Sequence, residues 1–232
     1  MAALDFPSNP TNGQTYEQYV YDTSITAWRN QGSPSGLAGQ VVALDNKMGL
    51  KNIVPPTVTI ASGTGSTNAI GKVSFTNATS VRLDGVFSTK YRHYRMIALY
   101  DNSDDNVDMA VRFCKNGTAY SASDHMEMAS RVTATGSVTA YSGNGDNRLY
   151  FGNGSSGGRP GSGTISADIS NPAHNTRVSM RFMSSGWYPT ASAYTSYTGT
   201  GLLLAPDVYD GIVIFPTIGT FSGSIIIYGY NE

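Results

Sequence analysis

The sequence predicts an all-β protein, an antiparallel β-sandwich of jelly-roll type preceded by a small extended N-terminal docking segment. Short runs with period-two alternation of apolar and polar residues are separated by Gly, Asn, Asp and Ser. Charged residues make up only 13% of the 232 residues, whereas 40% are hydrophobic and 11% aromatic, which favours buried β structure over disorder. The sequence shows neither strand–helix alternation nor heptad repeats.

Residues 1–30 form an extended aromatic segment with almost no core of its own. Two prolines and the pair Asn12-Gly13 interrupt it, and Asn-Gly favours a tight turn. The aromatic residues that follow are spaced as two short strands around a turn at residues 22–24. A module this small cannot bury enough apolar surface to be stable alone. We therefore expect it to lie on a larger structure, as in an assembly protein.

Residues 31–56 are predicted to link this segment to the main domain, residues 57–232. The first part, residues 30–40, is rich in Gly, Ser and Pro, as flexible linkers are. Residues 40–50 are apolar and fit either one helical turn or a strand. Pro55-Pro56 then interrupts the chain before the β-rich domain begins.

About ten strands are predicted in the main domain. In one of them Val178, Met180 and Phe182 share a face, which predicts one buried and one solvated side. Three consecutive isoleucines, residues 225–227, predict a strand covered on both faces. Residues 119–132 are the one segment expected to hold a short helix. The predicted strands are Val58–Ile60, Lys72–Thr76, Tyr94–Tyr100, Val107–Cys114, Ser137–Tyr141, Leu149–Gly152, Thr164–Ile169, Arg177–Ser184, Gly211–Phe215 and Ser224–Gly229.

Composition argues against several classes of function. The net charge of −1 gives no long-range field to attract nucleic acid, and no stretch approaches the ~18 apolar residues of a membrane span. We therefore expect no nucleic-acid binding and no membrane insertion. Cys114 is the only cysteine, and its apolar neighbours predict a buried, inert thiol. The N-terminus lacks a basic region followed by an apolar stretch, which predicts synthesis in the cytoplasm without a signal peptide.

The best metal candidate is the acidic loop 101–108. Asp101, Ser103 and Asp105 offer alternate oxygen ligands, as a calcium loop does. The loop lacks the central glycine of such sites, and Arg112 stands where a bidentate Glu is required. A polar hairpin loop between two strands is therefore favoured, and no metal site is predicted.

No catalytic constellation or cofactor motif stands out in the sequence. The acids that glycoside hydrolysis would need are scattered singly along the chain, at Asp84, Glu127, Asp168, Asp207 and Asp210. No spacing favours a pair among them. The three histidines are far apart, and no serine lies in a nucleophile-elbow motif. We expect no enzyme and no cofactor.

An aromatic segment near residue 190 is the best candidate for a ligand surface. Trp187, Tyr188, Tyr194 and Tyr197 are interleaved with Ser and Thr. Such rings stack on sugars while the hydroxyls bind sugar hydroxyls. The alternative is that the rings pack the end of the sandwich or a subunit interface.

The N-terminal segment also carries a family resemblance. Residues 6–16, with the pattern Phe-Pro-x-x-Pro-x-x-Gly-x-x-Tyr, precede an aromatic strand that ends near Trp28. This arrangement resembles the N-terminal segment of tailed-bacteriophage virion proteins, especially tail-fibre-like proteins of cyanophage type. Residues 73–95 and 222–230 carry a weaker resemblance to the β-rich distal domains of phage fibres and capsid appendages.

The resemblance implies a non-enzymatic virion structural protein, most simply a tail fibre or receptor-binding appendage that mediates host attachment. The expected partners are other virion proteins of the tail, portal region or capsid, and a glycan or protein of the host surface. The fibre resemblance also implies a homotrimer. A capsid decoration or head-fibre protein is the first alternative, and a glycan-degrading enzyme is the second. The residues expected to dock into the virion are Phe6, Pro7, Tyr16 and Trp28.

Overall fold

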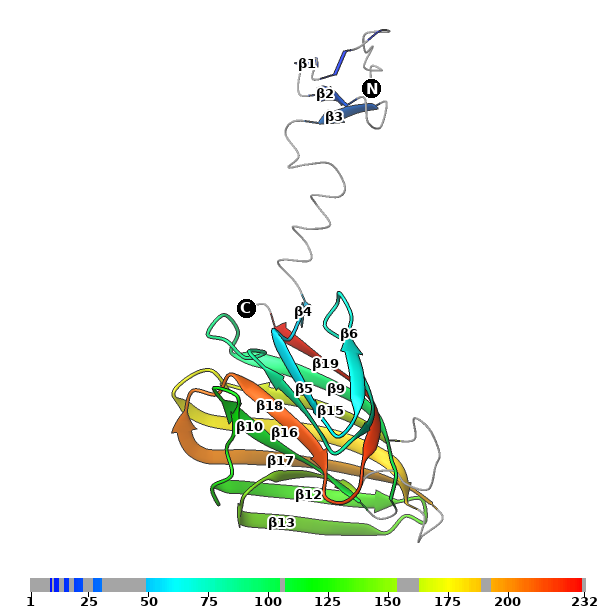
Figure 1. Ribbon diagram of the computed structural model, residues 1–232, viewed down its shortest axis with the longest axis vertical. Coiled ribbons are helices and arrows are strands. Elements are labelled where there is room, and N and C mark those ends of the chain that lie inside the picture. The colour runs from blue at the N-terminus through cyan, green and yellow to red at the C-terminus, as the bar shows by residue number, and fades with distance from the viewer. Residues whose placement is uncertain are drawn as a thin grey trace. The chain divides into compact units, whose positions relative to one another are not determined.

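Every regular element of the described chain is a β-strand in the computed structural model (Figure 1). The structure describes residues 9, 11–12, 15–16, 19–22, 27–30, 49–104, 107–153, 163–188 and 193–230. Among these residues there is no helix of the length and apolarity that crossing a membrane requires. The chain divides into two units, one reaching Gly49 and the other spanning Leu50–Tyr230.

The first unit contains a three-stranded antiparallel sheet with the order β1-β2-β3. In the register of the sheet Tyr16 lies opposite Tyr19, and Tyr21 lies opposite Trp28. Of the residues expected to dock into a virion, Phe6 and Pro7 lie outside the described residues. Tyr16 and Trp28 lie in strands, but their side chains are outside the described part. The strands are β1 (Thr15–Tyr16), β2 (Tyr19–Asp22) and β3 (Ala27–Asn30).

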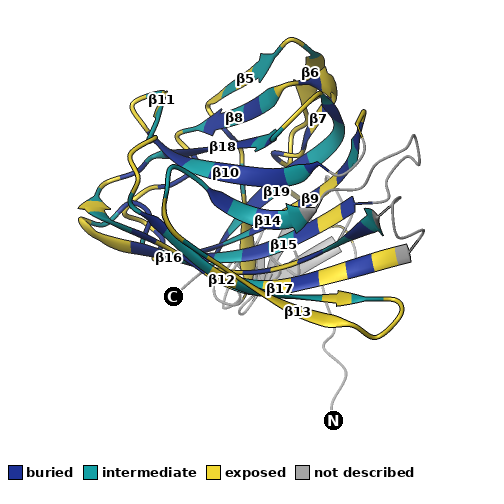
Figure 2. Cartoon of the chain, turned by 90° about the horizontal axis from the view of Figure 1, so that it is seen from below, coloured by how far each residue is buried: buried dark blue, intermediate teal, exposed yellow. Residues whose placement is uncertain are grey.

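The second unit is a sandwich of two antiparallel sheets, shown from below in Figure 2. The six-stranded sheet has the order β11-β10-β18-β8-β5, with β14 paired to β10. Its strands are β5 (Thr57–Ala61), β8 (Ser80–Asp84), β10 (Asp108–Lys115), β11 (Thr118–Ala119), β14 (Leu149–Asn153) and β18 (Gly211–Pro216). The ten-stranded sheet has the order β13-β12-β17-β16-β15-β9-β19-β7-β6, with β4 paired to β19. Its strands are β4 (Leu50–Ile53), β6 (Thr64–Thr67), β7 (Val73–Ala78), β9 (His93–Asn102), β12 (His125–Thr133), β13 (Val138–Asp146), β15 (Gly163–Ser170), β16 (Thr176–Tyr188), β17 (Ala193–Asp207) and β19 (Phe221–Tyr230).

Consecutive strands repeatedly lie in different sheets, as in a jelly roll. The chain passes from the smaller to the larger sheet between β8 and β9 and returns between β9 and β10. It crosses again between β11 and β12, β13 and β14, β14 and β15, β17 and β18, and β18 and β19. The predicted antiparallel sandwich is therefore confirmed, and each predicted strand overlaps a strand of the structure.

The helix expected within residues 119–132 is wrong, because most of this segment is strand β12. Residues 125–132 pair with β13 on one side, and residues 125–133 pair with β17 on the other. Backbone hydrogen bonds to two neighbouring strands outweigh the weak local preference for helix that Met and Ala provide. Tertiary pairing therefore decided the conformation of this segment.

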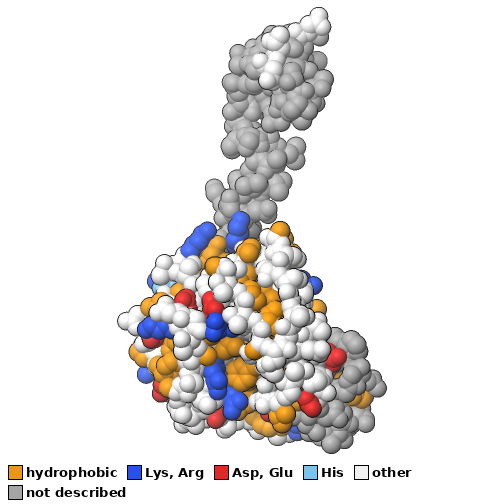
Figure 3. All heavy atoms as spheres, viewed as in Figure 1, with side chains coloured by type: hydrophobic (Ala, Val, Ile, Leu, Met, Phe, Trp, Pro, Cys, Tyr) orange, Lys and Arg blue, Asp and Glu red, His pale blue; other side chains and the backbone are white. Residues whose placement is uncertain are grey.

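The inner faces of both sheets supply one hydrophobic core. Val178, Met180 and Phe182 are buried in it, while Arg177 and Arg181 are exposed, as the alternation predicts. The Phe182 ring of β16 meets the Phe151 ring of β14 edge to face, with centroids 5.4 Å apart. This contact joins the larger sheet to the smaller one. The face in Figure 3 shows few charged side chains among apolar and uncharged polar ones, in keeping with the composition.

The strand that contains the three isoleucines, β19, is covered more on one face than on the other. Ile225 and Ile227 are buried, whereas Ile226 is half-buried. At the other end of the second unit's sequence, β4 pairs with β19 through Leu50–Ile53. Four residues of the range 31–56, predicted as a linker, therefore belong to the larger sheet.

The segment that follows β9 connects the two sheets and is not a hairpin loop, since β9 and β10 belong to different sheets. Ser103 N donates to Thr220 O at 2.8 Å, and Thr220 N donates to Ser103 Oγ at 3.0 Å. These bonds tie the segment to the β18–β19 connection. Asp105 lies outside the described residues. Within the described chain, no three His, Cys, Asp or Glu side chains come together to hold a metal.

Cys114, the single cysteine, is buried in β10, which confirms the prediction of a buried thiol. Burial and, to a smaller extent, the charge of Asp84 raise the pKa of the thiol to about 12. Because the thiolate is the reactive form, a thiol with this pKa is unreactive at neutral pH.

Candidate functional site

A pocket of about 430 Å³ opens beside β14, and residues of both sheets line it. The smaller sheet contributes Asp108 of β10 and Tyr150 of β14. The larger sheet contributes Glu127, Tyr141 and Tyr197 from β12, β13 and β17. Arg148, directly before β14, completes the polar part of the lining. We call this cavity the β14 pocket; its volume is typical of small-molecule sites.

Two side chains of the larger sheet hold β14, which pairs with β10 on one side only. Tyr150 N donates to Glu127 Oε2 at 2.5 Å. The Ser184 hydroxyl of β16 donates to the carbonyl oxygen of Phe151. These bonds satisfy backbone groups that an edge strand leaves unpaired. In Figure 2, β14 is seen next to β10 and near β12. The Glu127 carboxyl is thus held at the wall of the pocket by a backbone contact.

Tyrosine rings form the apolar part of the pocket. The Tyr141 and Tyr197 centroids lie 6.1 Å apart with a 44° tilt. Tyr141 is 40% exposed, whereas Tyr197 is only 3% exposed, so one ring is accessible and the other is buried beneath the surface. The Arg131 guanidinium carbon lies 5.3 Å from the centroid of Tyr141. The Tyr197 ring packs over Gly152, where a Cβ would lie 2.5 Å from a ring carbon. A larger residue at position 152 would therefore disturb the base of the pocket.

The two acids of the pocket have raised pKa values. Burial, with smaller contributions from the charges of Asp146 and Asp108, raises the pKa of Glu127 from 4.5 to about 7, although the hydrogen bond from Tyr150 N–H lowers it. Burial also raises the pKa of Asp108, while the charge of Arg131 lowers it. Near neutral pH the Glu127 carboxyl therefore exists both with and without its proton. It can donate a hydrogen bond in one form and accept hydrogen bonds in both.

The proximity of Asp108 and Glu127 cannot be predicted from the sequence. In the sequence Glu127 is one of several acids scattered singly along the chain, and no motif joins it to Asp108. The two residues lie in strands of different sheets, and the chain crosses between the sheets once on the way from β10 to β12. No local spacing or sequence motif indicates that two such residues lie in the same pocket.

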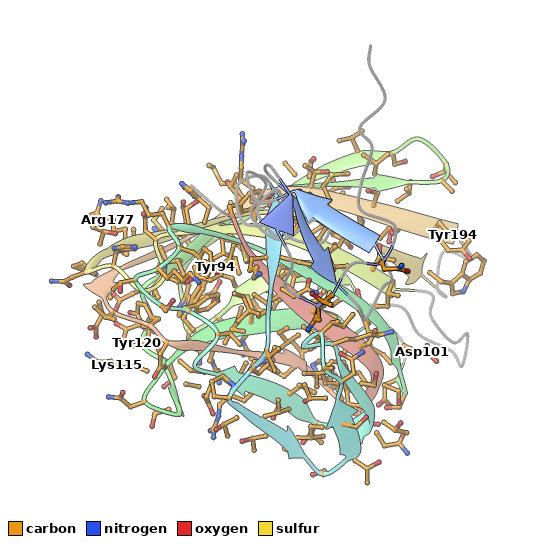
Figure 4. The ribbon with its side chains drawn as sticks, turned by 90° about the horizontal axis from the view of Figure 1, so that it is seen from above. Tyr94, Asp101, Lys115, Tyr120, Arg177 and Tyr194 are labelled. Atoms are coloured by element: carbon orange, nitrogen blue, oxygen red, sulfur yellow. The ribbon has the colours of Figure 1, made fainter. Side chains whose placement is uncertain are left out.

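The structure divides the predicted aromatic surface between the two faces of the larger sheet. Trp187 lies opposite Tyr194 in the β16–β17 pair. The two rings pack edge to face, with centroids 5.2 Å apart and an interplanar angle of 77°. Tyr194 is 57% exposed on the outer face, near one end of the sandwich (Figure 4). Tyr197, by contrast, is buried and lines the β14 pocket. Tyr188 lies opposite Ala193, but its side chain is outside the described part.

No family model matches the chain, and no curated protein matches it. Among solved structures, it is similar to the C-terminal CBM6 of LamC, a marine laminarinase from Zobellia galactanivorans, with 9% identity and a TM-score of 0.28 over 78% of this chain and 99% of that one. It is also similar to domain 4 of AbnA, a GH43 extracellular arabinanase from Geobacillus stearothermophilus, in complex with arabinotriose, with 13% identity and a TM-score of 0.25 over 75% of this chain and 82% of that one. The sandwich assignment rests on the strand pairing described above.

Proposed function

We propose that the protein is a non-enzymatic adhesion protein of a phage virion, and that its sandwich binds a saccharide in the β14 pocket. The observation that carries this proposal is the pairing of Tyr141 and Tyr150 with Asp108 and Glu127 in one pocket. Sugars present apolar ring faces together with many hydroxyl groups. Tyrosine rings pack against the faces, and carboxylates accept hydrogen bonds from the hydroxyls.

The virion part of the proposal is supported by the N-terminal resemblance and by the division of the chain into two units. In this proposal the first unit, with Phe6, Pro7, Tyr16 and Trp28, attaches to other virion proteins. The sandwich then meets the host surface. A homotrimer, as in phage fibres, would present several β14 pockets at once. Linked sites raise avidity above the affinity of a single pocket, so weak saccharide contacts suffice for attachment.

Replacing Tyr141 with alanine is expected to weaken saccharide binding about tenfold or more, because loss of an aromatic contact costs on the order of 1–2 kcal/mol. Tyr194→Ala is the matched control, since it removes another exposed tyrosine of the same sheet outside the pocket. The measurement is binding of the full chain to an array of neutral, uronate-containing and sulfated oligosaccharides.

Three outcomes of this experiment would contradict the proposal. Absence of binding to every oligosaccharide would exclude the saccharide site. Weakened binding in Tyr194→Ala alone would place the site at the Trp187–Tyr194 pair. Release of reducing sugar that Glu127→Gln abolishes would show a glycan-degrading enzyme, because this change keeps the shape of the side chain but removes its proton transfer.

Gold-labelled antibody against residues 50–230 is expected to mark the tails of particles that contain the protein. This result follows from the fibre-like resemblance of residues 1–30. Deletion of residues 1–30 should then remove the label while the isolated variant still melts cooperatively. Label on the head would instead support the capsid decoration or head-fibre alternative. Normal labelling of the deletion variant would show that another segment attaches the protein to the particle.

A further inference from the structure

Two arginines converge beside the β14 pocket on the outer face of the smaller sheet. The guanidinium carbon of Arg112, on β10, lies 5.0 Å from the centroid of Phe215 on β18. The guanidinium carbon of Arg148 lies 6.0 Å from the same ring and 5.4 Å from the centroid of Tyr150. Both cations therefore share one aromatic surface. We call Arg112 and Arg148 the arginine pair.

The register of the smaller sheet explains how this aromatic surface arises. Ala110 of β10 lies opposite Tyr150 of β14 on one side and Phe215 of β18 on the other. The alanine side chain between the two rings is short, and the guanidinium groups of Arg112 and Arg148 lie over the rings. Arg112 is two residues further along β10 and so extends from the same face of the sheet. Stacking on aromatic rings holds guanidinium groups in place before any ligand arrives.

Although Asp108 and Glu127 line the β14 pocket together with Arg148, the arginine pair has no ion-pair partner among the described residues. Neither residue forms an ion pair with a described carboxylate, in contrast to Arg82–Asp84, Arg95–Asp168 and Lys115–Asp207. Arg112 Nε donates to Asn147 O at 2.8 Å, whereas Arg148 Nε is buried and has no hydrogen-bond partner among the described residues.

The two cations also act on each other. Burial lowers the pKa of Arg112, and the charge of Arg148 lowers it further. Half-buried guanidinium groups in proteins usually have an anionic partner, because desolvation of an unpaired charge is costly. An anion that both guanidinium groups bind would remove this repulsion and supply the missing hydrogen-bond acceptor for Arg148.

We propose that the arginine pair binds the anionic group of an acidic saccharide whose sugar ring lies in the β14 pocket. This inference rests on the proposed function, and it specifies the class of saccharide. Arg148 and Tyr150 line the pocket and also belong to the arginine–aromatic surface, so one ligand can contact both. A planar guanidinium donates paired hydrogen bonds to a carboxylate or a sulfate. The anionic group is thus a uronate carboxylate or a sulfate ester.

Three hexasaccharides test the proposal on the full chain. The first, hexagalacturonate, carries carboxylates, and the second, its methyl ester, is neutral but otherwise matched. The third, a sulfated galactan hexasaccharide, separates sulfate from carboxylate as the source of the charge. We expect one of the two charged ligands to bind at least tenfold more tightly than the neutral ester, with an affinity that falls as salt concentration rises.

The variant of choice is Arg148→Gln, because the Arg148 Nε has no described hydrogen bond to lose. It is expected to weaken binding of the charged ligand about tenfold or more, and by a clearly larger factor than it weakens binding of the neutral ester. Arg112→Gln should act in the same direction. Arg177→Gln is the matched control, since Arg177 is exposed on β16 of the other sheet and labelled in Figure 4. Thermal melting of each variant shows whether it is folded.

The results separate failure of this inference from failure of the proposed function. Equal affinity for charged and neutral hexasaccharides, with wild-type binding by Arg148→Gln, would overturn the arginine site and leave the saccharide pocket standing. The arginine site would also be overturned if Arg177→Gln weakened binding of the charged ligand as much as Arg148→Gln does. The weakening would then follow from the net charge of the protein. No binding of any hexasaccharide, or of any member of the array, would refute the proposed function itself.

Discussion

Replacement of Phe182 with alanine is expected to lower the free energy of unfolding by about 3–5 kcal/mol. The Phe182 side chain is only 3% exposed and lies in the core between the sheets. Its ring meets Phe151 of β14 at an interplanar angle of 86°. The substitution removes apolar surface from the core, leaves a cavity and deletes an aromatic contact between the sheets. Chemical denaturation of the full chain measures the change.

Met183→Ala provides the matched control for this prediction. Met183 is adjacent in β16 but faces outward and is 61% exposed. Its truncation should change the free energy of unfolding by less than about 0.5 kcal/mol. Similar losses in the two variants would contradict the assignment of Phe182 to the core and Met183 to the surface. A loss below about 1 kcal/mol for Phe182→Ala would show that the contact between the sheets contributes little.

Replacement of Gly152 with alanine is expected to lower the free energy of unfolding by about 2–4 kcal/mol. Gly152 has a φ of +87°, a backbone conformation that costs an alanine about 1–2 kcal/mol. The added Cβ would also lie 2.5 Å from a carbon of the Tyr197 ring, which must move. Displacement of this ring alters the base of the β14 pocket. We therefore expect weaker saccharide binding together with the loss of stability.

Gly136→Ala separates the two contributions to this effect. Gly136 has a similar φ of +83°, but nothing lies within 4 Å of the position its Cβ would take. This variant should lose about 1–2 kcal/mol from backbone strain alone and keep wild-type saccharide binding. An equal loss of stability in the two variants, or unchanged binding by Gly152→Ala, would show that the Tyr197 ring adjusts to the methyl group without cost.

The extent to which the sequence predicts the fold is shown best by β16 and β12. In β16, the alternation of Val178, Met180 and Phe182 with polar residues matches the buried and exposed faces of the strand. In β12, Met126 and Met128 lie in a half-exposed strand whose alternation is weak, and a helix was expected there. A strand that buries one face shows an alternation of apolar and polar residues in its sequence. The conformation of β12 instead follows from its pairing with β13 and β17.

The candidate site was less predictable than the fold. The sequence groups the aromatic residues near position 190 as a candidate ligand surface, but it does not show that Tyr194 and Tyr197 lie on opposite faces of β17. The residues that join Tyr197 in the β14 pocket are Asp108, Glu127, Tyr141 and Tyr150, from four other strands. Likewise, Arg112 and Arg148 become neighbours only through the pairing of β10 with β14 and β18.

The sequence by itself determined that this protein is an antiparallel sandwich, because side-chain burial in a strand depends on local alternation and turn residues. It also determined the scarcity of charge and the buried state of the single thiol, Cys114. The tertiary structure alone decided which side chains share the β14 pocket and which arginines form no ion pair with a carboxylate of the described residues. Those features depend on strand order and on crossings between the sheets, which set distances between residues far apart in the chain.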